Sequence, residues 1–384
     1  MITAVLMALL AAQPLPAFTK HTVDPAFDGG YQVKTADLNR DGRLDIIALG
    51  TTPSQLVWYR APQWDKFPLD TGLERYIDAA PRDIDGDGDT DLAIASAFDL
   101  GNSSEGGLVH WLECPPNPED GKAWAAHYID QIPTSHRVRW ADWDGDGAPE
   151  LINLAIIGVG AAAPQYAGGL HFRAYTVPGD PGNTPWPQIL IDGTLEMAHG
   201  LSAIQWDADP ALEILTASFQ GVTLFDPGRP KTVIGAGHTG ERPKIGSSEV
   251  ALGSLAGGAR YIAAIEPWHG NEVVIYQPHP GGDLPWTRTV IDTTFEDGHA
   301  LLCADFNGDV DEEIVAGHRG GARSLYVYRF EPATRAWART PLDTGGMGAA
   351  GLDLADLDHD GDLDIIAIGT ATKNIAWYEN TTPR

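Results

Sequence analysis

The chain has 384 residues, enough for two or three domains or for one large all-β fold. It is rich in Gly (44), Pro (28) and Trp (12), a composition typical of β structure with many turns rather than of helices. Its net charge of −28 argues against a nucleic-acid partner held through phosphates, and no apolar run is long enough for a membrane span.

The N-terminal segment, residues 1–17, reads MITAVLMALLAAQPLPA, with an apolar run from Ile2 to Ala12 and a small residue at Ala17. This pattern predicts a signal peptide cleaved near Ala17, and therefore a secreted or periplasmic protein, although the usual preceding positive charge is missing. A buried first strand is the alternative. The two cysteines, Cys114 and Cys303, are far apart in sequence, and we expect unpaired, buried thiols rather than a disulfide.

The remainder of the chain, residues 18–384, repeats one acidic loop about every 50 residues, a spacing typical of propeller blades. Good copies are ADLNRDGRLDIIA, RDIDGDGDTDLAIA, ADWDGDGAPELINLA, ADFNGDVDEEIVA and ADLDHDGDLDIIA; IQWDADPALEILTA is a weaker copy, and ALGSLAGGARYIAA has lost its carboxylates. Aligned on the first loop residue, the equivalent positions are Asp37, Asp83, Asp142, Gln205, Leu252, Asp305 and Asp356.

Each unit continues with an apolar strand, an aromatic strand such as LVWYR or IAWYEN, and a fourth strand that ends in an acidic turn, such as KFPLDT. The last unit stops after its third strand, and residues 19–24, TKHTVD, fit the missing fourth. Seven four-stranded units predict an all-β fold, a single seven-bladed β-propeller over residues 18–384. The N-terminal strand would close the last blade.

The five good loops follow the spacing D-x-[D/N]-x-D-G-x-x-[D/E], which offers several oxygen ligands to a hard divalent cation. We therefore expect structural Ca²⁺ in at least some of them, and ordinary hairpin turns in the Gln205 and Leu252 units. The predicted ligands are Asp37, Asn39, Asp41, Asp45, Asp83, Asp85, Asp87, Asp91, Asp142, Asp144, Asp146, Glu150, Asp305, Asn307, Asp309, Glu313, Asp356, Asp358, Asp360 and Asp364.

These loops resemble the FG-GAP or VCBS repeats of integrin-like propellers. That resemblance covers essentially the whole chain after the N-terminal segment. It implies the fold but not the function, because adhesion proteins, lectins and enzymes share the repeat.

The start of each first strand must lie on the face of the ring opposite the acidic loop. Six residues before the loop, three of the chain's 12 histidines occupy this equivalent place: His136, His199 and His299. The ends of the second strands reach the same face, where a functional site is expected. They add Trp268, His269, Asn271, His318 and Arg319, and a long insertion contributes Tyr166.

Histidine and tyrosine can transfer protons, and arginine pairs with carboxylates. This set suits β-elimination from a uronic acid, with Arg137 or Arg319 neutralising the carboxylate and Trp268 stacking on a sugar face. Arg137 and Arg139 could instead pair with neighbouring blades. Three or more converging histidines could alternatively hold Zn²⁺.

The segments SHRVRWADWDGDG, PQYAGGLHFRAY, AHGLSAIQWD, PWHGNEVVIY, DGHALLCADFNGD and AGHRGG together resemble ulvan and rhamnose–glucuronate lyases and the propeller domain of aldos-2-ulose dehydratase. The resemblance implies elimination chemistry on a sugar by His, Tyr and Arg residues, with a metal in some members. We expect an acidic polysaccharide or sugar as the partner and a monomeric protein. The positions in the matching segments are His136, Tyr166, His199, His269, His299, His318 and Arg319. The chain lacks the dehydratase's further domains. A non-catalytic sugar- or protein-binding propeller and a purely structural scaffold stay open as alternatives.

Overall fold

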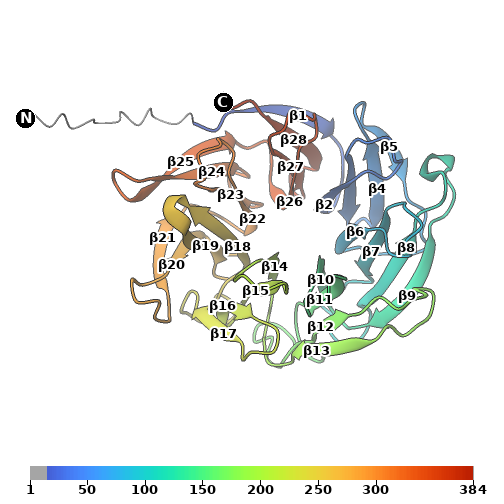
Figure 1. Cartoon of the computed structure of the whole chain (residues 1–384), viewed down its shortest axis with the longest axis horizontal. Helices are drawn as coiled ribbons and strands as arrows, with labels where there is room; N and C mark the ends of the chain where they lie inside the picture. Colours follow the sequence, from blue (N-terminus) through green and yellow to red (C-terminus); the bar gives the residue numbers. More distant parts are fainter. Residues whose placement is uncertain (1–14, 384) are drawn as a thin grey trace, which may run out of the picture.

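Seven four-stranded antiparallel sheets form a ring in the computed structural model, which describes residues 15–383 (Figure 1). The predicted seven-bladed β-propeller is confirmed. Most of the predicted signal peptide, residues 1–14, lies outside the described residues, so secretion stays a prediction. No helix within the described part of the chain is long and apolar enough to cross a bilayer.

Blades 1 to 6 take their strands in chain order from the centre outwards, and in blade 7 the N-terminal strand takes the outermost place (Figure 1). Blades 1 to 4 contain β2 (Gly30–Ala36), β3 (Asp45–Gly50), β4 (Gln55–Arg60) and β5 (Asp65–Pro68); β6 (Asp78–Arg82), β7 (Asp91–Ser96), β8 (Leu108–Glu113) and β9 (Ala125–Gln131); β10 (Ser135–Ala141), β11 (Glu150–Ala155), β12 (Phe172–Tyr175) and β13 (Gln188–Asp192); and β14 (Gly200–Ile204), β15 (Glu213–Ser218), β16 (Gly221–Phe225) and β17 (Thr232–Gly235).

Blades 5 to 7 follow the same plan. They contain β18 (Glu249–Leu255), β19 (Ala259–Glu266), β20 (Glu272–Gln277) and β21 (Thr287–Asp292); β22 (Gly298–Ala304), β23 (Glu313–His318), β24 (Leu325–Glu331) and β25 (Ala336–Asp343); and β26 (Ala349–Ala355), β27 (Asp364–Gly369), β28 (Asn374–Asn380) and β1 (Phe18–Asp24). Two short 3₁₀ turns, η1 (Pro118–Asp120) and η2 (Ala256–Gly258), complete the elements.

The ring closes as the sequence predicts. Strand β1 pairs antiparallel with β28, from Phe18 opposite Asn380 to Thr22 opposite Ala376. The segment before β1 continues the pairing, since the Ala17 N–H donates to Thr382 Oγ1 at 3.0 Å. The first and last residues of the fold therefore share one blade (Figure 1).

The core lies between neighbouring blades. All six residues of β3, β7, β11, β15, β23 and β27 are buried, because each second strand is covered on both faces by adjacent sheets. This double burial explains why these strands read as continuous apolar runs instead of alternating ones. Both cysteines are free, Cys114 buried and Cys303 partly buried, which confirms the expected unpaired thiols.

The acidic turns after the fourth strands connect one blade to the next. Asp24, at the end of β1, accepts hydrogen bonds from Tyr59 Oη at 2.6 Å and Lys66 Nζ at 2.8 Å, both from blade 1. The same tyrosine–aspartate–cation arrangement, here called the clasp, recurs at Asp130 with Tyr175 and Arg173, Asp292 with Tyr328 and Arg339, and Asp343 with Tyr378 and Lys20.

Candidate functional site

Every inner strand runs from one face of the ring to the other, and this places its two ends in different surroundings. In blade 3, β10 begins with Ser135 and His136 and ends at Ala141, directly before the acidic loop. The histidines and the acidic loops therefore lie on opposite faces, as expected. We call these faces the histidine end and the acidic end.

Four predicted histidines come together at the histidine end. The ring centroid of His199 is 4.7 Å from that of His136, 4.7 Å from that of His299 and 4.9 Å from that of His269. His199 is thus the central member of the cluster. It is fully buried, as is His136, and His299 is 1% exposed.

A tyrosine that the sequence analysis missed joins this cluster. Tyr31 Oη lies 2.8 Å from His136 Nε2 and 3.5 Å from His199 Nε2. Tyr31 is the residue six positions before Asp37, so the rule that found the three histidines also finds it. It was missed because that rule was applied to histidines alone.

Strand pairing defines the equivalent position in blade 5 as well. In blade 5, Glu249 pairs with Ile265 in the way that Arg137 pairs with Leu154 in blade 3. Ser248, the residue before Glu249, is therefore the counterpart of His136, the residue before Arg137. Counting six back from Leu252 would instead give Gly246. The alignment of the fifth unit was therefore wrong by two residues, because its shortened hairpin, with η2 in the turn, carries no acidic loop to align on.

The Nδ1 atoms of three histidines lie close to an oxygen atom, although His199 Nδ1 makes no hydrogen bond of good geometry. His299 Nδ1 donates to the Ala350 carbonyl oxygen at 2.6 Å, which leaves its buried Nε2 without a hydrogen-bond partner. His269 Nδ1 lies 2.9 Å from Asp297 Oδ1, and His199 Nδ1 lies 2.7 Å from a Glu249 oxygen. The unprotonated Nε2 of His299 is consequently available as a ligand or base, whereas His269 Nε2 lies 3.4 Å from His199 Nε2.

Burial keeps these rings neutral. Loss of solvation places the pKa of His136, His199 and His299 well below the usual value, and it lowers the pKa of His269 to about 3. Burial alone would raise the pKa of Asp297, but hydrogen bonds from His269 and Arg319 outweigh it, so this carboxylate is ionised.

Arg137 follows His136 on β10, and its guanidinium carbon lies 5.6 Å from the centre of the Tyr31 ring. It is 2% exposed, its Nη2 is 3.2 Å from Glu249 Oε1, and its buried Nη1 has no hydrogen-bond partner. Burial raises the pKa of Glu249 to about 7, against the opposing effect of Arg137. Arg139 instead pairs with Asp78 of blade 2 at 2.5 Å, the structural alternative that the sequence left open.

The other predicted residues divide into two groups. Arg319 belongs to the site, since its guanidinium binds Asp297 at 3.1 Å. Trp268 is adjacent, with its ring 4.6 Å from that of His269, and the Tyr166 ring packs against Trp268, 5.6 Å away. The structure places His318 elsewhere, stacked 4.7 Å from Phe295, and leaves Asn271 exposed.

At the acidic end, one carboxylate oxygen from each of three residues lies within 4.8 Å of the others in four loops: Asp83, Asp85 and Asp91; Asp142, Asp144 and Asp146; Asp207, Asp209 and Glu213; and Asp356, Asp358 and Asp360. The closing acid of each loop also supports the backbone. Glu150, for example, accepts a hydrogen bond from the Trp143 N–H at 2.9 Å, and Asp45 accepts one from Leu38 at 3.1 Å. Calcium in these loops stays a prediction.

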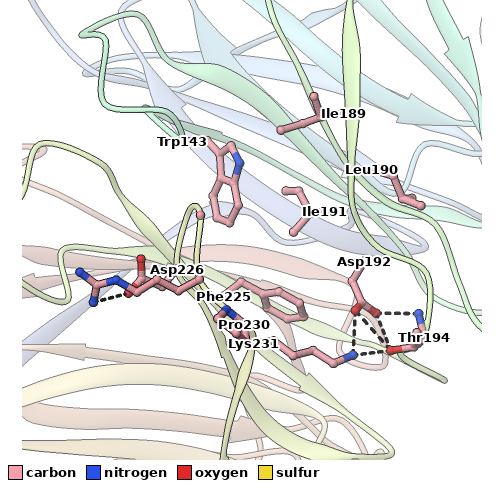
Figure 2. A pocket seen from close by; sticks show the side chains of 12 residues that line it. Trp143, Ile189, Leu190, Ile191, Asp192, Thr194, Phe225, Asp226, Pro230 and Lys231 are labelled. Atoms are coloured by element: carbon pink, nitrogen blue, oxygen red, sulfur yellow. Dashed lines mark hydrogen bonds and ion pairs between the residues drawn. The ribbon is translucent and has the colours of Figure 1, made fainter.

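A separate hollow of about 450 Å³ lies between the outer strands of blades 3 and 4 (Figure 2). Its lining includes Trp143, Ile191 and Phe225, and its charged groups pair with one another: Lys231 with Asp192 at 2.7 Å and Arg229 with Asp226 at 2.9 Å. Its lining residues lie outside the histidine cluster.

Comparison with protein families supports the resemblance stated from the sequence. Residues 106–279 match the model of the aldos-2-ulose dehydratase beta-propeller domain. Residues 37–94 and 305–367 match that of the FG-GAP-like repeat. The chain is similar to each of them over these residues. The dehydratase match spans His136, Tyr166, His199 and His269. No curated protein sequence matches the chain.

Solved structures confirm the fold alone. The chain is similar to two crystal structures of BBS1N in complex with ARL6DN, soaked with mercury and with lead. Sequence identity is 14% and 12%, the TM-scores are 0.55 and 0.56, and the matches cover 97% of this chain and 97% and 98% of those chains.

Proposed function

We propose that the histidine end is the active site of a carbohydrate-active propeller that performs β-elimination on a uronic-acid-containing polysaccharide or sugar. The match to the dehydratase propeller domain supports a carbohydrate substrate. The observation that carries the chemistry is the convergence of buried, neutral imidazoles beside a tyrosine and a buried arginine with an unpaired donor.

The cluster fits a divalent transition metal such as Zn²⁺. His199, His269 and His299 each offer a nitrogen within 4.8 Å of the other two. Two nitrogens at 2.0–2.1 Å from a tetrahedral zinc are about 3.4 Å apart, and His199 Nε2 and His269 Nε2 are 3.4 Å apart. Two unprotonated nitrogens that face each other repel unless a cation or a proton lies between them. Carboxylates lie beside the Nδ1 atoms of both rings and favour a proton on each Nδ1, so the gap between the two Nε2 atoms suits a cation.

When bound at these three histidines, zinc would act as a Lewis acid on a carbonyl or carboxylate oxygen. Asp297, Glu249 and the Ala350 carbonyl would orient the three rings, as carboxylates and carbonyls do for histidine ligands generally. Arg319 holds Asp297 in place through two hydrogen bonds.

The unpaired Nη1 of Arg137 would bind the substrate carboxylate, because a buried guanidinium donor without a partner gains most from an anionic acceptor. This contact would stabilise the negative charge that develops when the proton next to the carboxylate is removed. The electrons of that C–H bond then form the double bond, while the C–O bond breaks and the leaving oxygen takes its pair.

His136 and Tyr31 would transfer the two protons. His136 is neutral and can accept the proton from carbon, and Tyr31 Oη, 2.8 Å from its Nε2, can donate one to the leaving oxygen. Burial raises the pKa of Tyr31, so the phenol is protonated before the reaction begins. We also propose export of the protein, structural Ca²⁺ at the acidic end and a monomeric state.

A screen of acidic polysaccharides for the ultraviolet absorbance of an unsaturated uronate, with and without chelator, tests this function. We expect turnover by the wild type and its loss in His136→Ala and Tyr31→Phe, while His279→Gln, at an exposed position, keeps it. Binding of a polysaccharide that is weakened in both variants, without turnover by any protein, would favour a non-catalytic binding propeller instead.

A further inference from the structure

A polysaccharide cannot reach the proposed base while the histidine end keeps the arrangement seen in the structure. His136 is fully buried, as is His199 beside it. The ring centroid of Phe98, which follows β7, lies 5.6 Å from that of His136. A sugar that reacts at His136 therefore needs part of this end to move first.

Phe98 belongs to one of two long connections that contact each other across blades 2 and 3, here called the cover. Residues 97–107 join β7 to β8, and residues 156–171 join β11 to β12. They are the two longest of the seven connections between second and third strands. Ser103 Oγ, in the first connection, donates to the Ala161 carbonyl oxygen, in the second, at 2.7 Å. The two connections are therefore placed to move together.

The longer connection is held firmly at its base and by few side chains at its tip. At the base, Thr134 Oγ1 donates to the Ile157 carbonyl oxygen at 2.9 Å. At the tip, residues 159–169, only Ala161 and Tyr166 are buried. A segment with so few buried side chains opens at a lower free-energy cost than the strands that carry it.

Two glycines near the ends of this tip suit it to movement. Gly160 has a φ of 79° and Gly168 a φ of 115°, values in the region that favours glycine. A Cβ atom added at either position would meet no heavy atom within 4 Å. The backbone therefore has both the freedom and the space to rotate at these two points.

An ion pair outside the cover fastens the tip in place. Glu196 Oε1 accepts the Gly168 N–H at 2.7 Å, and the same carboxylate pairs with Arg242. Arg242 Nη1 in turn donates to the Gln165 carbonyl oxygen at 2.8 Å. The two charged side chains are 20% and 26% exposed, so salt in solution weakens their attraction.

We propose that the cover is a lid over His136, fastened by Glu196 and Arg242, which opens to admit a sugar chain and then closes over it. Closure excludes water from the site, and this strengthens the contact between Arg137 and a substrate carboxylate. The inference rests on the proposed function, because only a reaction at His136 requires a substrate to reach that residue.

Modification of histidines by diethyl pyrocarbonate, followed by peptide mass spectrometry, tests the lid without any substrate. The quantity measured is the rate at His136 relative to that at His279, an exposed residue in the same sample. Glu196→Gln keeps an acceptor for Gly168 but removes the charge. We expect it to raise this ratio about two- to fivefold, the factor that corresponds to a partly exposed ion pair.

Arg242→Ala should raise the ratio at least as much, because it removes the contacts with both Glu196 and Gln165. Glu241→Gln, an exposed neighbour, is the matched control and should leave the ratio unchanged. Added salt should raise the ratio in the wild type and have little effect in Arg242→Ala. Wild-type ratios in both Glu196→Gln and Arg242→Ala would overturn the proposal. A lid that opens in a protein without turnover would count against the elimination chemistry and support the lid.

Discussion

The acidic end and the histidine end of the inner strands come from the same repeat but differ in what the repeat preserves. At the acidic end, residue types recur from blade to blade, and most contacts stay within one loop, such as Glu150 with Trp143. At the histidine end, equivalent positions hold Tyr31, His136, His199 or Ser248, and contacts cross between blades, as from Tyr31 to His136. Repetition therefore marks what builds the fold, and departures from it mark the candidate site.

Removal of calcium should break the acidic end and produce the largest effect. Each occupied loop contributes about 2.7 kcal/mol to the free energy of unfolding when free Ca²⁺ is 100 times its Kd, and several loops act together. Thermal unfolding with and without a chelator checks this. An unchanged melting temperature would mean that the loops fold as solvated turns.

Substitutions at the histidine end should weaken metal binding there and leave the contribution of calcium to the free energy of unfolding unchanged. His299→Ala removes an unpaired Nε2, and Asp297→Asn weakens the orientation of His269. Loss of an orienting carboxylate typically lowers metal affinity 10- to 100-fold, as we expect for Asp297→Asn; loss of a ligand lowers it further. Zn²⁺ competition with a chromophoric chelator measures both. Equal affinity in all three proteins would contradict the three-histidine site.

The clasps, which join neighbouring blades at the ends of their fourth strands, should respond to acid. Burial by itself raises the pKa of Asp24, but hydrogen bonds from Lys66 and Tyr59 outweigh it, and the net pKa lies below the usual value of 3.8. A lowered pKa stabilises the fold above about pH 4, and the stabilisation disappears as pH falls through the folded-state pKa.

Asp24→Asn should consequently cost about 1–3 kcal/mol of unfolding free energy at neutral pH, where a hydrogen-bonded charge is lost. The difference from the wild type should shrink in acid. Denaturant titrations at pH 7 and pH 3 measure it, and a difference that stays constant between them would refute the assignment.

The smallest effect is expected at His318, which the sequence placed with the catalytic residues. The His318 ring stacks on Phe295, and His318→Phe should keep that packing. We therefore expect turnover and Zn²⁺ affinity near the wild-type values, and a change in the free energy of unfolding below about 1.5 kcal/mol. Loss of turnover in a folded His318→Phe protein would return this residue to the site.

The sequence predicted the number of blades, the closure by β1 and the register of three histidines, because strand period and loop spacing are local properties of the chain. It could not predict that Asp297 lies beside His269 and Glu249 beside His199. Those contacts join residues 28 and 50 positions apart through loop and blade geometry. It could not predict that the Tyr166 ring packs against Trp268, since the path of a long insertion is not encoded in a repeat.

The acidic turns after the fourth strands show the same limit. Their recurrence was visible in the sequence, but their role was not, because the tyrosine partner of Asp24 lies 35 positions away in the next blade. The repeat pattern locates such an aspartate in the sequence, and the packing of neighbouring sheets explains its role.

X-ray absorption at the zinc edge, on protein loaded with one equivalent of Zn²⁺, tests most directly whether the histidine end is the chemical site. The account predicts a first shell dominated by imidazole nitrogens at about 2.0–2.1 Å, lost in His299→Ala. A shell of oxygens alone, unchanged in that variant, would place the metal in the acidic loops and contradict the account.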